Sequence, residues 1–151
     1  MRSGRTEDTE IVILMADDDP DDLMLTRDAL AESRLANRFD TVEDGEDLMD
    51  YLRRQGKFEH LAQEPLPGLL LLDLNMPKKD GREALREIRA DPKLRHIPIV
   101  VLTTSQAEED ILTSYDIGVN SFIVKPVSFE RLVEVMRVVT TYWFQIVERP
   151  S

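Results

Sequence analysis

The sequence predicts an α/β protein built on a doubly wound, five-stranded parallel sheet with five helices. Short apolar segments alternate five times with segments of helical periodicity. Strands and helices that alternate in this way favour a parallel sheet with helices on both faces. Several short segments are apolar throughout, as in strands buried on both sides. Acidic, hydroxyl and basic residues follow these segments, at the sheet edge where such proteins bind ligands.

The first strand is expected over residues 11–16, a continuous β-branched apolar run. A helix follows from Pro20 to about Ser33, because proline suits the first helical position, where a backbone N–H is not needed. Its apolar face is expected to carry the following residues: Leu23, Thr26 and Leu30.

The next unit is a short strand over 38–43 and a helix over 45–56. Asp44 precedes this helix and is placed to cap its free N–H groups. Residues 56–68 contain Pro65, Pro67 and Gly68, which favours a loop.

The second half of the chain repeats the alternation. Residues 69–74 read LLLLDL, a second apolar strand that ends in an acid. The remaining elements are expected as turn 75–81, helix 82–90, strand 97–104, helix 107–118, strand 121–124 and a last helix from about 128 to 147. Ser105 and Glu108 have the spacing of a capping box before the fourth helix.

Composition excludes several classes of function. The net charge is −11, which opposes binding to nucleic acid or to an anionic membrane surface and suits a divalent cation or a basic protein face. There is no cysteine, so disulfides and thiolate chemistry are excluded. No apolar run is long enough for a membrane span, and the polar N-terminus does not have the pattern of a signal peptide. We therefore expect a cytoplasmic protein.

A run of five acids follows the first strand, in the segment ADDDPDD. Asp19 lies before Pro20 and is expected to cap the helix, and Asp21 and Asp22 lie in its first turn, where the helix dipole favours negative charge. Asp17 and Asp18 lie before the cap, at the end of the strand, and no capping role covers both. These two acids are the candidate metal ligands.

Asp73 and Lys125 are expected at the same sheet edge as Asp17 and Asp18, together with Thr103. Converging carboxylates repel one another unless a cation neutralises them, and an all-oxygen set favours Mg²⁺ or Mn²⁺. A lysine and a hydroxyl beside that cation can bind phosphoryl oxygens, and one carboxylate can act as the nucleophile. The pattern therefore indicates phosphoryl transfer through an aspartyl phosphate.

Four motifs together resemble the receiver domain of bacterial two-component response regulators: the DD pair, LLLLDLNMPKKDG, VVLTTS and FIVKP. The resemblance covers nearly the whole chain and implies a flavodoxin-like sheet with strand order 2-1-3-4-5. It also implies that Asp73 is the phosphoacceptor and that a histidine on a sensor kinase is the donor. The protein would then catalyse only its own phosphorylation and dephosphorylation.

The resemblance assigns the remaining site residues. Asp18 would bind Mg²⁺ directly, Asp17 largely through water, and Asn75 through its backbone carbonyl. Thr103 would bond the phosphoryl group and Lys125 would pair with one of its oxygens, with a cis bond to Pro126. These are expectations from the family, each carried to the matching residue of this chain.

Two positions depart from the common family pattern. Phe122 occupies the switch position, where tyrosine is frequent, and lacks a hydroxyl that could form a hydrogen bond. Thr104 stands where many members have alanine, and its bulk is expected to narrow access to Asp73. The long loop over 56–68 and the tail containing YWFQIVERP resemble single-domain regulators that partner bacterial or cyanobacterial phytochromes.

Two other functions are compatible with an acidic strand end. One is a Mg²⁺-dependent phosphohydrolase of the haloacid-dehalogenase type, with Asp17 as nucleophile in the Asp17-x-Asp19 pair. That class would leave Asp73 without a role. The other is a receiver fold that takes no phosphate and serves only as a docking module, which the intact set of acids, threonine and lysine opposes.

The domain organisation is expected to be a flexible N-terminus over 1–10, a receiver domain over 11–147 and a tail over 148–151. The last helix carries apolar residues on nearly all its faces, which indicates burial on more than one side. A homodimer through this helix and residues 140–151 is therefore expected, with output through protein contacts.

Overall fold

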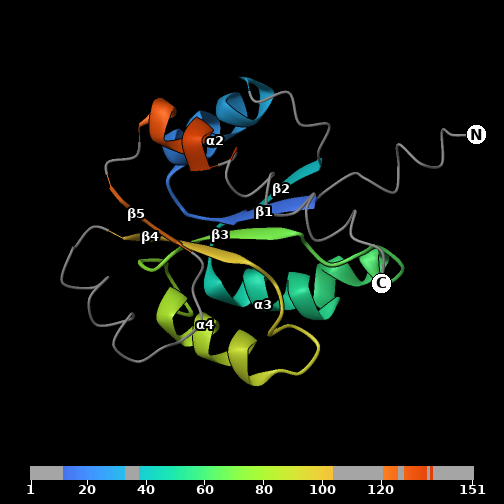
Figure 1. The fold of residues 1–151 in the computed structure, drawn as a ribbon. Helices are drawn as coiled ribbons and strands as arrows, with labels where there is room; N and C mark the ends of the chain where they lie inside the picture. Colours follow the sequence, from blue (N-terminus) through green and yellow to red (C-terminus); the bar gives the residue numbers. More distant parts are fainter. Residues whose placement is uncertain (1–11, 33–37, 104–120, 126–127, 136, 138–151) are drawn as a thin grey trace, which may run out of the picture.

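The computed structural model describes residues 12–32, 38–103, 121–125, 128–135 and 137. The five strands within this part of the chain form one parallel sheet of order β2-β1-β3-β4-β5, as predicted (Figure 1). Their bounds are β1 Val12–Ala16, β2 Arg38–Val42, β3 Leu69–Asp73, β4 Ile99–Thr103 and β5 Ser121–Val124. The strand order reverses beside β1, so the carboxyl ends of β1 and β3 flank the switch point of the sheet.

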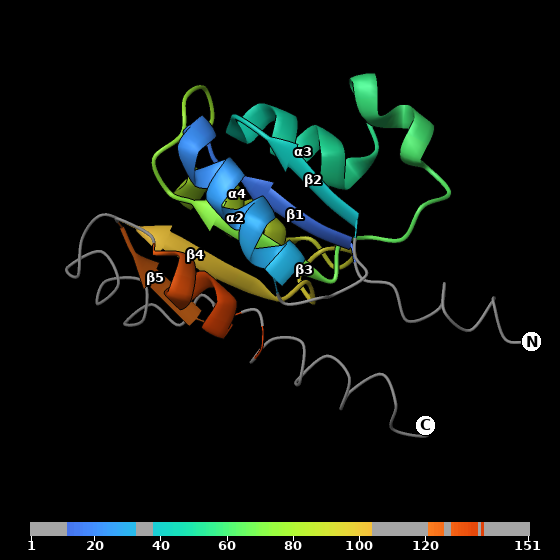
Figure 2. The ribbon, with the colours of Figure 1, turned by 90° about the horizontal axis from the view of Figure 1, so that it is seen from above.

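Helices cover both faces of the sheet (Figures 1 and 2). The bounds of the named helices are α2 Pro20–Glu32, α3 Gly45–Arg53 and α4 Gly81–Ala90. Residues 129–135 are also helical and begin the predicted last helix. In Figure 1, α2 and residues 129–135 lie above the sheet, and α3 and α4 lie below it.

Alternate residues of each central strand enter different cores, because successive side chains of a strand point to opposite faces. Leu14, Leu70 and Leu72 pack with α3 and α4. Met15 and Leu71 pack with α2 and with the helical residues 129–135. The side chains on both faces of the central strands are buried, which explains why these strands are apolar throughout.

The helix α3 has the cap that its sequence predicts, and both α3 and α4 bury an apolar face. The Asp44 side chain accepts a hydrogen bond from the Asp47 N–H at 2.8 Å, at the start of α3. The buried apolar side chains of α3 are Leu48, Met49, Tyr51 and Leu52. The corresponding buried residues of α4 are Ala84, Leu85 and Ile88.

The prediction of a loop over 56–68 is wrong for its first half, where Gly56–Leu61 forms the 3-10 helix η1. Gly56 adopts a φ of 55°, which turns the chain sharply after α3. The Phe58 ring then packs edge-on against the buried Tyr51 ring, with centroids 5.3 Å apart. A helix this short shows no periodicity in the sequence, which is why the pattern did not predict it.

Several predictions fall on residues outside the described part of the chain. These are the flexible N-terminus over 1–10, the helix over 107–118 with its capping box, Thr104, Pro126 and the self-association segment over 140–151. Among the described helices, none has the length and apolar character that crossing a membrane requires.

Candidate functional site

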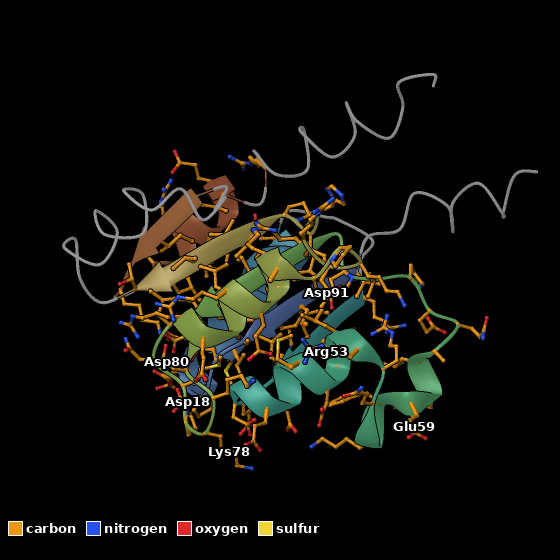
Figure 3. All side chains as sticks on the ribbon, turned by 90° about the horizontal axis from the view of Figure 1, so that it is seen from below. Asp18, Arg53, Glu59, Lys78, Asp80 and Asp91 are labelled. Atoms are coloured by element: carbon orange, nitrogen blue, oxygen red, sulfur yellow. The ribbon has the colours of Figure 1, made fainter. Side chains whose placement is uncertain are left out.

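Polar residues from four strands meet at the carboxyl edge of the sheet. Asp17 directly follows β1, Asp73 ends β3, Thr103 ends β4 and Lys125 directly follows β5. Asp17, Asp73 and Thr103 are all buried, although they are polar or charged. Burying such groups is unfavourable unless they have partners, so this edge is the candidate site. Figure 3 labels Asp18 at this end of the molecule.

Asp17, Asp18 and Asp73 can hold a metal ion. One carboxylate oxygen from each of these residues lies within 4.8 Å of the others. Asp18 is exposed, whereas the other two carboxylates are buried. Carboxylate oxygens suit hard divalent cations, and an exposed ligand leaves room for water and substrate oxygens. The arrangement therefore fits the predicted Mg²⁺ or Mn²⁺.

The electrostatics of Asp17 also favour a bound cation. Burial raises the pKa of this carboxyl to about 7, and the Asp73 and Asp22 carboxylates add to the increase. The backbone N–H of Asp19 donates to Asp17 Oδ1 at 2.9 Å and acts in the opposite direction, as does Lys125. The charged form of Asp17 is therefore disfavoured by its surroundings, and a bound cation would stabilise it.

Lys125 is the cation that the described chain supplies to these acids. Its Nζ donates to Asp17 Oδ2 at 3.2 Å and to Asp73 Oδ2 at 3.1 Å, and lies 2.8 Å from Asp22 Oδ2. Burial lowers the pKa of Lys125, but the three carboxylates raise it by a larger amount. The pKa of Lys125 is therefore above its ordinary value. The Lys125 backbone N–H also donates to the Thr103 carbonyl at 2.7 Å, which joins β5 to the end of β4.

The turn after β3 is held close to Asp73. The Asn75 N–H donates to Asp73 Oδ1 at 3.0 Å, which fixes one carboxylate oxygen. Asp80 caps α4 through the Arg82 N–H at 2.7 Å. A Cβ on Gly81 would lie 2.4 Å from the Asp73 carbonyl oxygen, so only glycine permits α4 to begin this near the strand.

The same turn also packs against the start of α3. A Cβ on Gly45 would lie 1.9 Å from the Lys79 carbonyl oxygen, which is too close for any side chain. Lys78 has a φ of 65°, uncommon for a residue other than glycine, and its Nζ lies 3.6 Å from Asp44 Oδ2. Lys79 is partly buried in an ion pair with Glu87. Figure 3 labels Lys78 and Asp80 beside Asp18.

The structure brings most of the predicted site residues together. Asp17, Asp18, Asp73 and Lys125 form one cluster, and Thr103 lies at the adjoining strand end. Phe122 pairs with Val101 through the backbone of β5, and nothing further is described for this residue. The Lys125–Pro126 bond lies outside the described residues.

The run of five acids divides almost as predicted. The Asp19 side chain caps α2, accepting from the Asp21 N–H at 2.9 Å, and this cap was predicted. The prediction for Asp22 was incomplete, because its carboxylate forms an ion pair with Lys125 in addition to lying in the first helical turn. No sequence signal distinguishes Asp22 from Asp21, because the helix dipole already explains an acid at either position.

Comparisons with known proteins agree with this geometry. Residues 13–137 match the family described as response regulator receiver domain. The chain is 39% identical over 140 residues to response regulator Rcp1 of Synechocystis sp., covering 93% of each protein. The crystal structure of the phosphorylated cyanobacterial phytochrome response regulator RcpA superposes with a TM-score of 0.76, at 42% identity and covering 94% of this chain and 99% of that one. The Mn²⁺-bound form of Rcp1 gives 0.74, at 38% identity, with 93% and 99% covered.

Proposed function

The chain belongs to the response regulator receiver family, and on this premise we propose that it accepts a phosphoryl group on Asp73 from a sensor histidine kinase. The observation that carries the proposal is the meeting of Asp73 with Asp17, Asp18 and Lys125 at one sheet edge. The family match favours this function over the haloacid-dehalogenase type of phosphohydrolase, which needs Asp17 as nucleophile. The receiver function also gives Asp73 a chemical role, which the hydrolase function does not.

The transfer needs one nucleophile and several groups that neutralise charge. Asp73 Oδ2 attacks the phosphorus of a phosphohistidine, and the P–N bond breaks with its electron pair remaining on the imidazole. Asn75 holds the other Asp73 oxygen through its N–H, so the carboxylate keeps one orientation. The Lys125 ammonium, 3.1 Å from Asp73 Oδ2, is placed to pair with an incoming phosphoryl oxygen.

Asp17, Asp18, Asp73 and the Asn75 carbonyl would hold the metal ion. When bound, this ion would neutralise charge between the carboxylates and the phosphoryl oxygens. We assign the Thr103 hydroxyl to a further phosphoryl oxygen, since Thr103 ends the strand paired with β3. A shift of Thr103 toward the phosphoryl group would then alter the Phe122 side of the sheet and carry the signal to a protein partner.

Intact mass after incubation with Mg²⁺ and acetyl phosphate tests the acceptor. We expect one phosphoryl adduct on the wild-type protein and none on Asp73→Asn. Asp17→Asn is compared with Asp73→Asn, because a hydrolase would need Asp17 as its nucleophile whereas a receiver would need it only to hold the metal ion. An adduct retained by Asp73→Asn but absent from Asp17→Asn would refute the receiver assignment. Beryllofluoride binding by an unreactive wild type would indicate a receiver that rejects small donors.

A phytochrome kinase is the proposed donor. RcpA is described as a cyanobacterial phytochrome response regulator, and it matches this chain at 42% identity over nearly its full length. The test compares initial rates of transfer from a phosphorylated bacterial phytochrome and from an unrelated histidine kinase at equal concentration. Faster transfer from the phytochrome supports the assignment, and equal or slower transfer contradicts it.

Sedimentation of the purified protein with and without beryllofluoride tests the proposed homodimer. A monomer under both conditions would contradict it.

A further inference from the structure

We propose that Asp22 is a positioning residue that shares the Lys125 ammonium with Asp17 and Asp73 in the resting state and releases it when a phosphoryl group arrives. The phosphoryl part of this inference rests on the proposed function. The part that concerns metal affinity does not. Asp22 lies in the first turn of α2, on a different element from the strand ends that carry the other two acids.

The inference begins with the contacts of one nitrogen. Lys125 Nζ lies 2.8 Å from Asp22 Oδ2, 3.2 Å from Asp17 Oδ2 and 3.1 Å from Asp73 Oδ2. The contact with Asp22 is therefore the shortest of the three. An ammonium group has three N–H donors, and three carboxylates surround this one. A phosphoryl oxygen can gain a donor from Lys125 only if one of the carboxylates loses its contact.

The degree of burial indicates which carboxylate gives up the ammonium. The side chains of Asp17 and Asp73 are 0% and 3% exposed, whereas that of Asp22 is 16% exposed. Asp17 and Asp73 are buried beside the candidate metal site, so without the ammonium they would depend on the metal ion or the phosphoryl group for compensation. Asp22 is not among these metal-ligand candidates, so it would need water when it loses the ammonium. Asp22 lies where solvent can reach it, so it can be hydrated when Lys125 turns toward the phosphoryl group.

The charge of Asp22 has opposite effects on the two expected ligands. Its carboxylate adds negative potential that attracts a divalent cation, and it partly neutralises an ammonium that would otherwise repel that cation. The same negative charge repels a phosphoryl group and competes with it for Lys125. Removing the charge should therefore weaken metal binding and strengthen the binding of a phosphoryl analogue. A residue that only stabilises α2 would not produce opposite shifts.

Asp21 provides a matched control. It precedes Asp22 on the same helical turn and carries the same charge, but its side chain is exposed. Within the described part of the chain it forms no ion pair with Lys125. Asp21→Asn therefore removes the same charge without removing the contact. Asp22→Glu keeps the carboxylate and serves as the conservative variant.

The experiment measures two equilibria by calorimetry for the wild type, Asp22→Asn, Asp22→Glu and Asp21→Asn. The first is the affinity for Mg²⁺ alone, and the second is the affinity for beryllofluoride at saturating Mg²⁺. For Asp22→Asn we expect Mg²⁺ binding to weaken roughly threefold to tenfold and beryllofluoride binding to tighten by a similar factor. Asp21→Asn should change both by less than about twofold, because exposed charges are screened. Asp22→Glu should return both values toward the wild type.

Parallel shifts in Asp22→Asn, or equal shifts in Asp21→Asn, would overturn the inference. Thermal unfolding of each variant identifies a general loss of structure. Such a loss would lower the affinities for Mg²⁺ and for beryllofluoride together, which is a parallel shift. If the wild type fails to bind beryllofluoride, the proposed function fails instead. The Mg²⁺ measurement then decides whether Asp22 tunes the cation site, and an unchanged affinity in Asp22→Asn would refute that too.

Discussion

Two clusters of charge in this molecule use similar groups and have opposite character. The rim cluster consists of Asp17, Asp22, Asp73 and Lys125, at the carboxyl edge of the sheet. The edge network consists of Arg38, Asp40, Tyr51 and Glu64, beside the outer strand β2. In the rim cluster three carboxylates share one ammonium. In the edge network each carboxylate has donors of its own.

The contacts of Asp40 show what a satisfied carboxylate looks like. Tyr51 donates its hydroxyl to Asp40 Oδ2 at 2.6 Å, and Arg38 Nη2 donates to the same oxygen at 3.0 Å. Arg38 Nη1 also donates to Glu64 Oε1 at 2.9 Å. The hydrogen bond with Asp40 raises the pKa of Arg38 above its ordinary value. This network needs no ligand, whereas the rim cluster has excess negative charge that a cation would neutralise.

Asp17→Asn should give the largest effect, because it removes buried excess charge from the rim cluster. Burial raises the pKa of Asp17 to about 7, well above its ordinary value, and each pKa unit corresponds to about 1.4 kcal/mol. We expect the metal-free variant to be more stable than the wild type by about 2 kcal/mol at pH 8, by denaturant unfolding. Its Mg²⁺ affinity should fall by at least about tenfold.

The sign of the Asp17 effect depends on pH. A pKa raised on folding means that the charged form disfavours the folded state. The penalty is absent below the ordinary carboxyl pKa, where the proton is bound in both states, and complete above pH 7. The stability difference between Asp17→Asn and the wild type should therefore vanish near pH 4. A difference that stays constant with pH would contradict this account.

Asp40→Asn should have the opposite effect on stability. The amide keeps the shape of the side chain but loses the charge that Arg38 and Tyr51 bind. We expect a loss of about 1–2 kcal/mol, whether or not Mg²⁺ is present. Asp28→Asn is the matched control, because Asp28 is exposed on α2 and has no ion pair within the described residues. Equal effects from both variants would mean that net charge, not the network, sets the stability.

Tyr51→Phe should give the smallest change, a loss of about 1 kcal/mol, because only one hydrogen bond is removed and the ring stays buried. Burial, together with Asp40, raises the pKa of the Tyr51 hydroxyl to about 12. The hydrogen bond from the Tyr51 hydroxyl to Asp40 therefore contributes fully to stability below about pH 10, and this contribution is lost as the pH rises through 12. The wild type and Tyr51→Phe should therefore become equally stable at strongly alkaline pH, as judged by unfolding at several pH values.

The rim cluster could largely be anticipated from the sequence, and the edge network could not. Parallel strands end at a common edge, so Asp17, Asp73 and Lys125 could be placed together from the order of elements alone. No comparable rule connects Asp40 with Tyr51, since that contact depends on how α3 lies against β2. Asp22 was missed for a related reason, because its position in the first turn of α2 already had a local explanation.

The close approach at Gly45 has a consequence for protein engineering. The turn over 75–80 carries the Asn75 carbonyl, yet its path depends on a residue far away in the sequence, because a Cβ at position 45 would occupy the place of the Lys79 carbonyl. The turn and Gly45 therefore form one transplantable module. A chimera that takes this turn from a relative must also have a glycine at position 45, because any side chain there would clash with the backbone of the grafted turn.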